Sequence, residues 1–143
     1  MKPIEILLVE DNPADVELTR ETMHAARVHN TLHVTRDGEE AMRFLRRQAP
    51  FEGAPTPDLI LLDLNLPRKD GREILAEVKQ DPALQIIPVV VLTSSEAHED
   101  VIKSYRLHAN AYVQKPVTLN GCQQIVNAID GFWLSIVKLP GRG

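Results

Sequence analysis

Short apolar runs alternate with charged, amphipathic segments along the chain. The apolar runs are rich in Val, Ile and Leu and lack a clean two-residue alternation, a pattern typical of strands buried on both faces of a parallel sheet. Four runs are strong and the fifth is weaker: residues 4–10, 32–36, 58–64, 86–93 and 111–115. The hydrophobic pattern therefore predicts five buried strands.

The segments between these runs carry helix-start signals. After the first run, Asn12 is suited to cap a helix, Pro13 to occupy its first position and Asp15 to interact favourably with its dipole. Asp37 is followed by Glu40 and Asp70 by Glu73, three residues on, which is the spacing of a capping box. The further predicted N-caps are Asp37, Asp70, Ser94 or Ser95, and Thr118.

Strands and helices alternate five times in this interpretation, which indicates an α/β fold. Single helices between parallel strands imply right-handed crossovers and an open sheet covered on both faces. We expect one domain over residues 1–143, and we interpret the proline-rich stretch 49–57 as a loop within it.

Composition and charge narrow the class of protein. The chain has 143 residues, of which 43 % are hydrophobic and 25 % charged, as in ordinary globular proteins. The formal net charge of −4 argues against a nucleic-acid-binding protein, which needs a basic surface. The single cysteine, Cys122, cannot close a disulfide within the chain, and no apolar segment has the length of a signal peptide or a membrane span. We expect a cytoplasmic protein that binds neither nucleic acid nor membrane.

Polar side chains gather where the predicted strands end. The first strand ends at Glu10 and Asp11, the third at Asp63, the fourth at Thr93 and the fifth just before Lys115. Because ligands of open parallel sheets bind beyond the carboxyl ends of the strands, these five residues should meet. Three crowded carboxylates repel unless a cation offsets them, and an oxygen-rich set without His or Cys suits Mg²⁺. The sequence thus predicts a magnesium site.

An acid at the end of a strand is often only the N-cap of the next helix. That explanation accounts for any one of these residues, but not for matching chemistry at four strand ends. The chain also lacks a glycine-rich phosphate loop and a Ser or Cys nucleophile with an evident base. A carboxylate beside a divalent ion can itself attack a phosphoryl group and form an acyl phosphate. Asp63, on the middle strand, is the expected nucleophile.

Four sequence motifs resemble the receiver domain of bacterial two-component response regulators: VEDN, LLDLNLPRKDG, VVVLTSS and AYVQKP. The resemblance runs from about Ile4 to Ala128, nearly the whole chain. It implies the flavodoxin-like (βα)5 receiver fold, a five-stranded parallel sheet in the order 2-1-3-4-5 with five flanking helices. It also implies a phosphoacceptor that catalyses only its own phosphorylation and dephosphorylation.

The resemblance assigns the phosphoryl and metal chemistry to particular residues. Asp63 would receive the phosphoryl group from the phosphohistidine of a sensor histidine kinase. Glu10, Asp11, Asp63 and the backbone carbonyl of Asn65 would hold Mg²⁺, partly through water.

Three further residues would respond to the phosphate. Thr93 would hydrogen-bond a phosphoryl oxygen, and Lys115 would pair with the phosphate. Tyr112 matches the family's switch aromatic, which turns inward when Thr93 is drawn to the phosphate; plain packing on a short strand is the alternative. Such a switch is a population shift, in which phosphate stabilises a minor conformation.

The C-terminal segment 131–143 carries apolar residues around more of a helix circumference than one buried stripe uses. We interpret it as an extension that forms a homodimer, although packing against the end of the core would explain the same residues. The interface residues would be Phe132, Trp133, Leu134 and Val137. We expect output through protein contacts, without a DNA-binding domain.

A finer resemblance concerns the partner. The extended C-terminus and the long loop before the third strand are similar to those of single-domain regulators paired with bacterial phytochrome kinases, so the expected kinase is of that type. Two alternatives stay open. One is a relay that passes phosphate on to a histidine phosphotransfer protein, and the other is a scaffold that works without phosphorylation.

Overall fold

A five-stranded parallel sheet forms the centre of the computed structural model, which describes residues 3–25, 29–64, 66, 69–93, 109 and 111–115. The neighbouring strands all pair in parallel, in the order β2-β1-β3-β4-β5, which confirms the predicted fold. The strands are β1 (Ile4–Val9), β2 (Asn30–Thr35), β3 (Leu59–Asp63), β4 (Val89–Thr93) and β5 (Ala111–Gln114).

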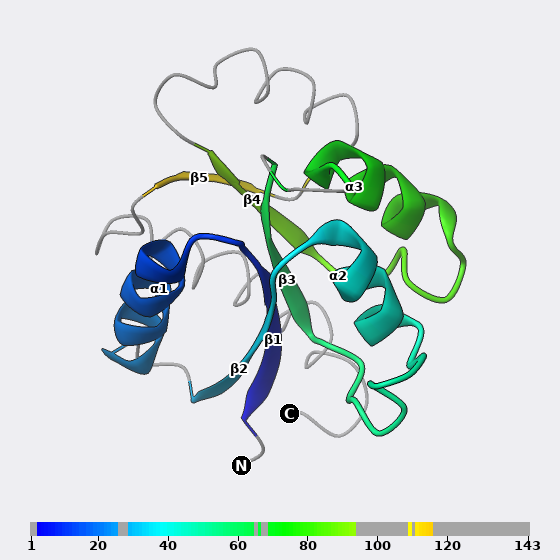
Figure 1. Cartoon of the computed structure of the whole chain (residues 1–143), viewed down its shortest axis with the longest axis horizontal. Helices are drawn as coiled ribbons and strands as arrows, with labels where there is room; N and C mark the ends of the chain where they lie inside the picture. The colour runs from blue at the N-terminus through cyan, green and yellow to red at the C-terminus, as the bar shows by residue number, and fades with distance from the viewer. Residues whose placement is uncertain are drawn as a thin grey trace, which may run out of the picture.

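Helices cover both faces of this sheet. In Figure 1, α1 (Pro13–Ala25) lies on one side, and α2 (Gly38–Leu45) and α3 (Gly71–Gln80) lie on the other. No helix in the described part of the chain is long and apolar enough to cross a membrane. The fourth and fifth predicted helices, with their N-caps at Ser94 or Ser95 and at Thr118, lie outside the described residues.

The predicted N-caps fix where the three helices begin. Asn12 Oδ1 accepts hydrogen bonds from the backbone N–H groups of Ala14 at 2.9 Å and Asp15 at 3.1 Å. These bonds satisfy two of the free donors of the first turn and hold Asp15 beside the end of β1. Asp37 and Asp70 cap α2 and α3 in the same manner.

The core consists of two layers, one on each face of the sheet. Along β1, Leu7 and Val9 pack with residues of α2 and α3, whereas Ile6 and Leu8 pack with residues of α1. All four side chains are fully buried. Because both faces are covered, the strand has no polar face, which explains why the sequence shows a continuous apolar run.

The proline-rich stretch 49–57 is an irregular connection between α2 and β3, as predicted. Phe51 and Ala54 pack against the core layer of α2 and α3, and the Phe51 ring lies 5.4 Å from that of Phe44. The loop therefore covers part of the core.

Candidate functional site

The strands end in register, so their terminal side chains meet at one edge of the sheet, which we term the carboxyl edge. Val9 pairs with Leu62, which places Glu10 level with Asp63. The backbone N–H of Glu10 donates to the carbonyl oxygen of Thr35 at 3.0 Å and so extends the sheet by one residue. Parallel pairing alone brings these two acids together.

Lys115 lies at the centre of this edge. Its Nζ atom is 3.1 Å from Glu10 Oε1, 3.1 Å from Asp63 Oδ2 and 3.0 Å from Asp15 Oδ2. The Lys115 side chain is 18 % exposed, and those of Glu10 and Asp63 are 1 % and 4 % exposed. Water therefore screens these charges little, and the ammonium is held by three charge-assisted hydrogen bonds.

Burial and neighbouring charge change the acidity of the site. Burial, together with a side-chain hydrogen bond to Asp63 and the negative charge of Asp63, raises the pKa of Glu10 to about 7, although Lys115 acts in the opposite direction. Burial also acts to lower the pKa of Lys115, but the hydrogen bond that Lys115 donates to Asp15 and the charges of Asp63 and Glu10 outweigh it and raise that pKa. Lys115 is thus positively charged across the physiological range.

Three acids at this edge form a site suited to a divalent cation. Glu10, Asp11 and Asp63 can each offer one carboxylate oxygen, and these three oxygens lie within 4.8 Å of one another. The donors are all oxygen, and Asp11 is exposed, so a bound ion could keep water ligands on that side. This chemistry fits Mg²⁺, which prefers oxygen ligands and retains several waters.

Gly71 lets the start of α3 lie close to the site. Its N–H donates to the carbonyl oxygen of Leu64 at 3.1 Å. A Cβ atom at this position would lie 2.5 Å from the Asp63 carbonyl oxygen and 2.6 Å from the Leu64 Cα atom. Only glycine lets the start of α3 approach the backbone of Asp63 this closely.

The structure brings together four of the predicted site residues: Glu10, Asp11, Asp63 and Lys115. The backbone of Thr93 ends β4 and that of Tyr112 lies in β5, but their side chains are outside the described part. The remaining predicted site and interface residues also lie outside it: Asn65, Phe132, Trp133, Leu134 and Val137.

Asp15 is a member of the site that the sequence pattern does not predict. Its sequence position indicated only a favourable interaction with the helix dipole. One signal was available, because the Asn12-Pro13 step fixes the start of α1 and so places Asp15 in the first turn, directly after β1. Nothing in the sequence showed that this turn faces Lys115.

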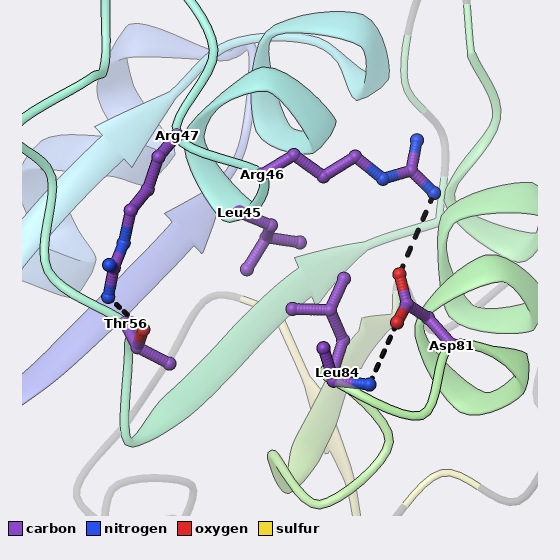
Figure 2. Close-up of a pocket in the computed structure, with 7 residues that line it drawn as sticks. Leu45, Arg46, Arg47, Thr56, Asp81 and Leu84 are labelled. Atoms are coloured by element: carbon purple, nitrogen blue, oxygen red, sulfur yellow. Dashed lines mark hydrogen bonds and ion pairs between the residues drawn. The ribbon is translucent and has the colours of Figure 1, made fainter.

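A second concave region lies at the opposite edge, the amino edge of the sheet. This hollow of about 360 Å³ is lined by the end of α2 and by the segments that precede β3 and β4. In Figure 2, Arg46 and Arg47 extend toward opposite sides of it, Arg46 to Asp81 and Arg47 to Thr56, with Leu45 and Leu84 between them. Since the two guanidinium groups diverge, the hollow has no shared anion-binding centre.

Comparison with known proteins identifies the family. The family model for the response regulator receiver domain matches residues 6–129. Response regulator Rcp1 of Synechocystis sp. is 51 % identical over 138 residues, which is 96 % of this chain and 94 % of that protein. The probable methanogenesis regulatory protein FilR2 of Methanothrix harundinacea is 37 % identical, over 97 % of this chain and 89 % of that one.

Solved structures agree in fold. The Mn²⁺-bound form of Rcp1 superposes with a TM-score of 0.77 at 51 % identity and covers 97 % of this chain and 100 % of that one. The phosphorylated cyanobacterial phytochrome response regulator RcpA gives a TM-score of 0.79 at 49 % identity, and the match covers 98 % of this chain and 100 % of that one. The acidic metal site and Lys115 at the carboxyl edge agree with these findings. The chain therefore belongs to the response regulator receiver family and is a phosphoacceptor signalling protein that is phosphorylated on aspartate.

Proposed function

We propose that Asp63 is the phosphoacceptor and that a sensor histidine kinase donates the phosphoryl group. The observation that supports this assignment is the surroundings of its carboxylate, which is buried at the end of the central strand β3, 3.1 Å from the Lys115 ammonium and beside Glu10 and Asp11. No other acid in the described part of the chain lies both in this acidic group and on the central strand.

The proposed reaction is an in-line phosphoryl transfer. A carboxylate oxygen of Asp63 forms the new O–P bond while the P–N bond of the donor phosphohistidine breaks, and the electron pair leaves with the imidazole nitrogen. A divalent ion held by Glu10, Asp11, Asp63 and the Asn65 carbonyl would neutralise charge on the phosphoryl oxygens.

Residues of neighbouring strands would hold the phosphoryl group. The Lys115 ammonium, already at the Asp63 carboxylate, would pair with a phosphoryl oxygen. Thr93, at the end of β4, would donate a hydrogen bond from its hydroxyl and draw Tyr112 inward as the switch residue. The resulting conformation would carry the signal to a protein partner.

The relatives support a more specific kinase. RcpA is a phytochrome response regulator, and AtBRR, 41 % identical with a TM-score of 0.82 over 93 % of this chain and 96 % of that one, is a bacteriophytochrome response regulator. We therefore assign this chain a phytochrome-type histidine kinase as its donor, in the cytoplasm. We also retain the proposed homodimer through residues 131–143, which a single monomeric species at high micromolar concentration in size-exclusion chromatography would exclude.

Intact-mass spectrometry tests the assignment of Asp63. The protein is incubated with acetyl phosphate, with Mg²⁺ or with a chelator. Wild type should gain one phosphoryl group only with Mg²⁺, and Asp63→Asn should gain none. Asp58→Asn is the matched control at the other end of β3, since the Asp58 side chain accepts a hydrogen bond from the Glu5 N–H, which asparagine can also do.

A phosphoryl group on Asp63→Asn would refute the assignment, and peptide mapping would then locate the true acceptor. Absence of any phosphoryl group on wild type, while Mg²⁺ still binds, would favour the scaffold that works without phosphorylation.

A further inference from the structure

Asp15 lies closest to Lys115 of its three carboxylate partners, yet it is not one of the acids suited to hold the metal. Its Oδ2 atom is 3.0 Å from Lys115 Nζ, and the two residues are 100 positions apart in the chain. The acids whose oxygens group for a cation, among the residues that the structure describes, are Glu10, Asp11 and Asp63. We term these three acids the metal set. Lys115 therefore lies between Asp15 and two members of the metal set, Glu10 and Asp63.

This arrangement makes the ammonium a competitor for the metal ligands. Lys115 contacts Glu10 Oε1 and Asp63 Oδ2, both at 3.1 Å, and these two carboxylates are also members of the metal set. When Glu10 and Asp63 turn their oxygens toward a cation, Lys115 loses two partners and is repelled by the new charge. Asp15 is the carboxylate that can still hold it.

The position of Asp15 suits this task. The Asn12 cap fixes its backbone in the first turn of α1 through the 3.1 Å bond to its N–H. Its side chain is 24 % exposed, so it lies at the solvent side of the site, unlike the buried Glu10. A partner of this kind holds an ammonium without itself entering the metal site.

We infer that Asp15 is a positioning residue that keeps a partner for Lys115 when Glu10 and Asp63 turn toward a divalent ion, and so makes these two carboxylates easier to release to the metal. This inference rests on the proposed function of the Asp63 site. Asp15 then acts on the metal site through Lys115. Removal of the Asp15 carboxylate should strengthen the contacts of Lys115 with Glu10 and Asp63.

Isothermal titration calorimetry of the unphosphorylated chain with Mg²⁺ alone tests this role. Asp15→Asn should lower the Mg²⁺ affinity about fivefold, the size expected for coupled contacting residues. Asp15→Glu, which keeps the charge, should restore most of the affinity. In a Lys115→Met background, Asp15→Asn should change the affinity less than about twofold, because the competing ammonium is gone.

Glu17→Gln is the matched control. It removes one acid from the same helix, and its contact is with Arg20 at 3.9 Å on an exposed surface. It should leave the Mg²⁺ affinity near that of wild type. An equal loss in Glu17→Gln, or an undiminished effect of Asp15→Asn in the Lys115→Met background, would mean that Asp15 acts only through its long-range charge and would overturn the inference.

Nuclear magnetic resonance of the lysine ammonium groups gives a second measurement that does not require the Lys115→Met variant to fold. With saturating Mg²⁺, a slowly exchanging Lys115 ammonium signal should be present in wild type and lost in Asp15→Asn. Persistence of that signal in Asp15→Asn would overturn the inference. Absence of Mg²⁺ binding by wild type would instead count against the proposed metal site itself, so the two failures are distinguishable.

Discussion

The carboxyl edge and the amino edge of the sheet both gather charged side chains, but they differ in burial and in direction. At the carboxyl edge, Glu10, Asp63 and Asp15 converge on Lys115 within 3.1 Å. At the amino edge, Arg46 lies 3.9 Å from Asp81, with its side chain 40 % exposed. Exposed ion pairs contribute about 0–1 kcal/mol to stability, whereas buried charges strongly affect one another. Of these two edges, as far as the structure describes them, the carboxyl edge is therefore the one suited to chemistry.

The two edges also differ in how tightly the backbone is packed, and glycine substitutions would test this. At Gly71, on the carboxyl edge, a Cβ atom would meet backbone atoms of Asp63 and Leu64 at 2.5 and 2.6 Å. Because backbone atoms cannot move aside without distorting β3 and α3, we expect Gly71→Ala to lower the free energy of unfolding by about 3 kcal/mol. Urea denaturation followed by circular dichroism measures the change.

Gly53, in the loop before β3, is the control for that substitution. A Cβ atom there would meet no heavy atom within 4 Å. Gly53→Ala should therefore alter the free energy of unfolding by less than about 0.5 kcal/mol. Similar values for the two variants would show that the edges do not differ in backbone packing.

Buried charge at the carboxyl edge should make stability depend on pH in the absence of metal. The pKa of Glu10 is raised in the folded protein from 4.5 to about 7, first by burial and then by Asp63. The folded state therefore binds more protons than the unfolded state between these values. The contribution of Glu10 is fully present below about pH 4.5 and is lost as the pH rises through 7, a change of about 3 kcal/mol.

Thermal unfolding of wild type and Glu10→Gln with a chelator, from pH 5 to pH 8, checks this dependence. The stability of Glu10→Gln relative to wild type should increase with pH, because glutamine does not ionise. Arg46→Gln, at the amino edge, should show a stability difference from wild type that stays nearly constant with pH. A constant difference for Glu10→Gln as well would contradict the proposed effect of burial.

The smallest expected change in the free energy of unfolding comes from the backbone at the amino edge. Arg47 has a φ of 55°, in the left-handed region, directly after the end of α2. The N–H of Gln48 donates to the Arg43 carbonyl at 2.8 Å, and that of Arg47 to the Phe44 carbonyl at 3.2 Å, a helix end that usually carries glycine. Arg47→Gly should raise the free energy of unfolding by about 1 kcal/mol, since glycine adopts this φ without strain.

Arg46→Gly provides the comparison, measured by the same denaturant titration. Arg46 has a φ of −94°, which any residue can adopt, so glycine there should give no gain. Equal effects at both positions would indicate that left-handed strain does not contribute at this edge.

Much of the fold could be predicted because its determinants are local. The apolar runs marked the five strands, and Asn12, Asp37 and Asp70 marked the starts of the three described helices. The N-cap hydrogen bonds join residues two or three apart, so the chain near each cap contains all the information. The first residues of β4 were misplaced, since the apolar run began at residue 86 but the strand begins at Val89, after Pro88. Ile86 is 72 % exposed, which apolar character alone does not reveal.

The carboxylates of the site were predictable for a similar reason. Parallel strands bring their carboxyl ends to one edge, so acids at the ends of two neighbouring strands must approach each other whatever the remaining sequence. Glu10 and Asp63 follow this rule directly. The family resemblance added the roles expected of Thr93 and Tyr112, which pattern alone does not supply.

The sequence by itself determined which groups stand at the carboxyl edge, because strand ends and helix caps are set by neighbouring residues. Only the tertiary structure decided how strongly these groups interact and which of them share Lys115. Burial of Glu10 depends on the packing of the layers on both sides of the sheet, and the contact of Asp15 with Lys115 depends on how α1 is placed against the end of β5. Both are relations between distant segments, and distance and dielectric, which control electrostatic energy, exist only once the chain has folded.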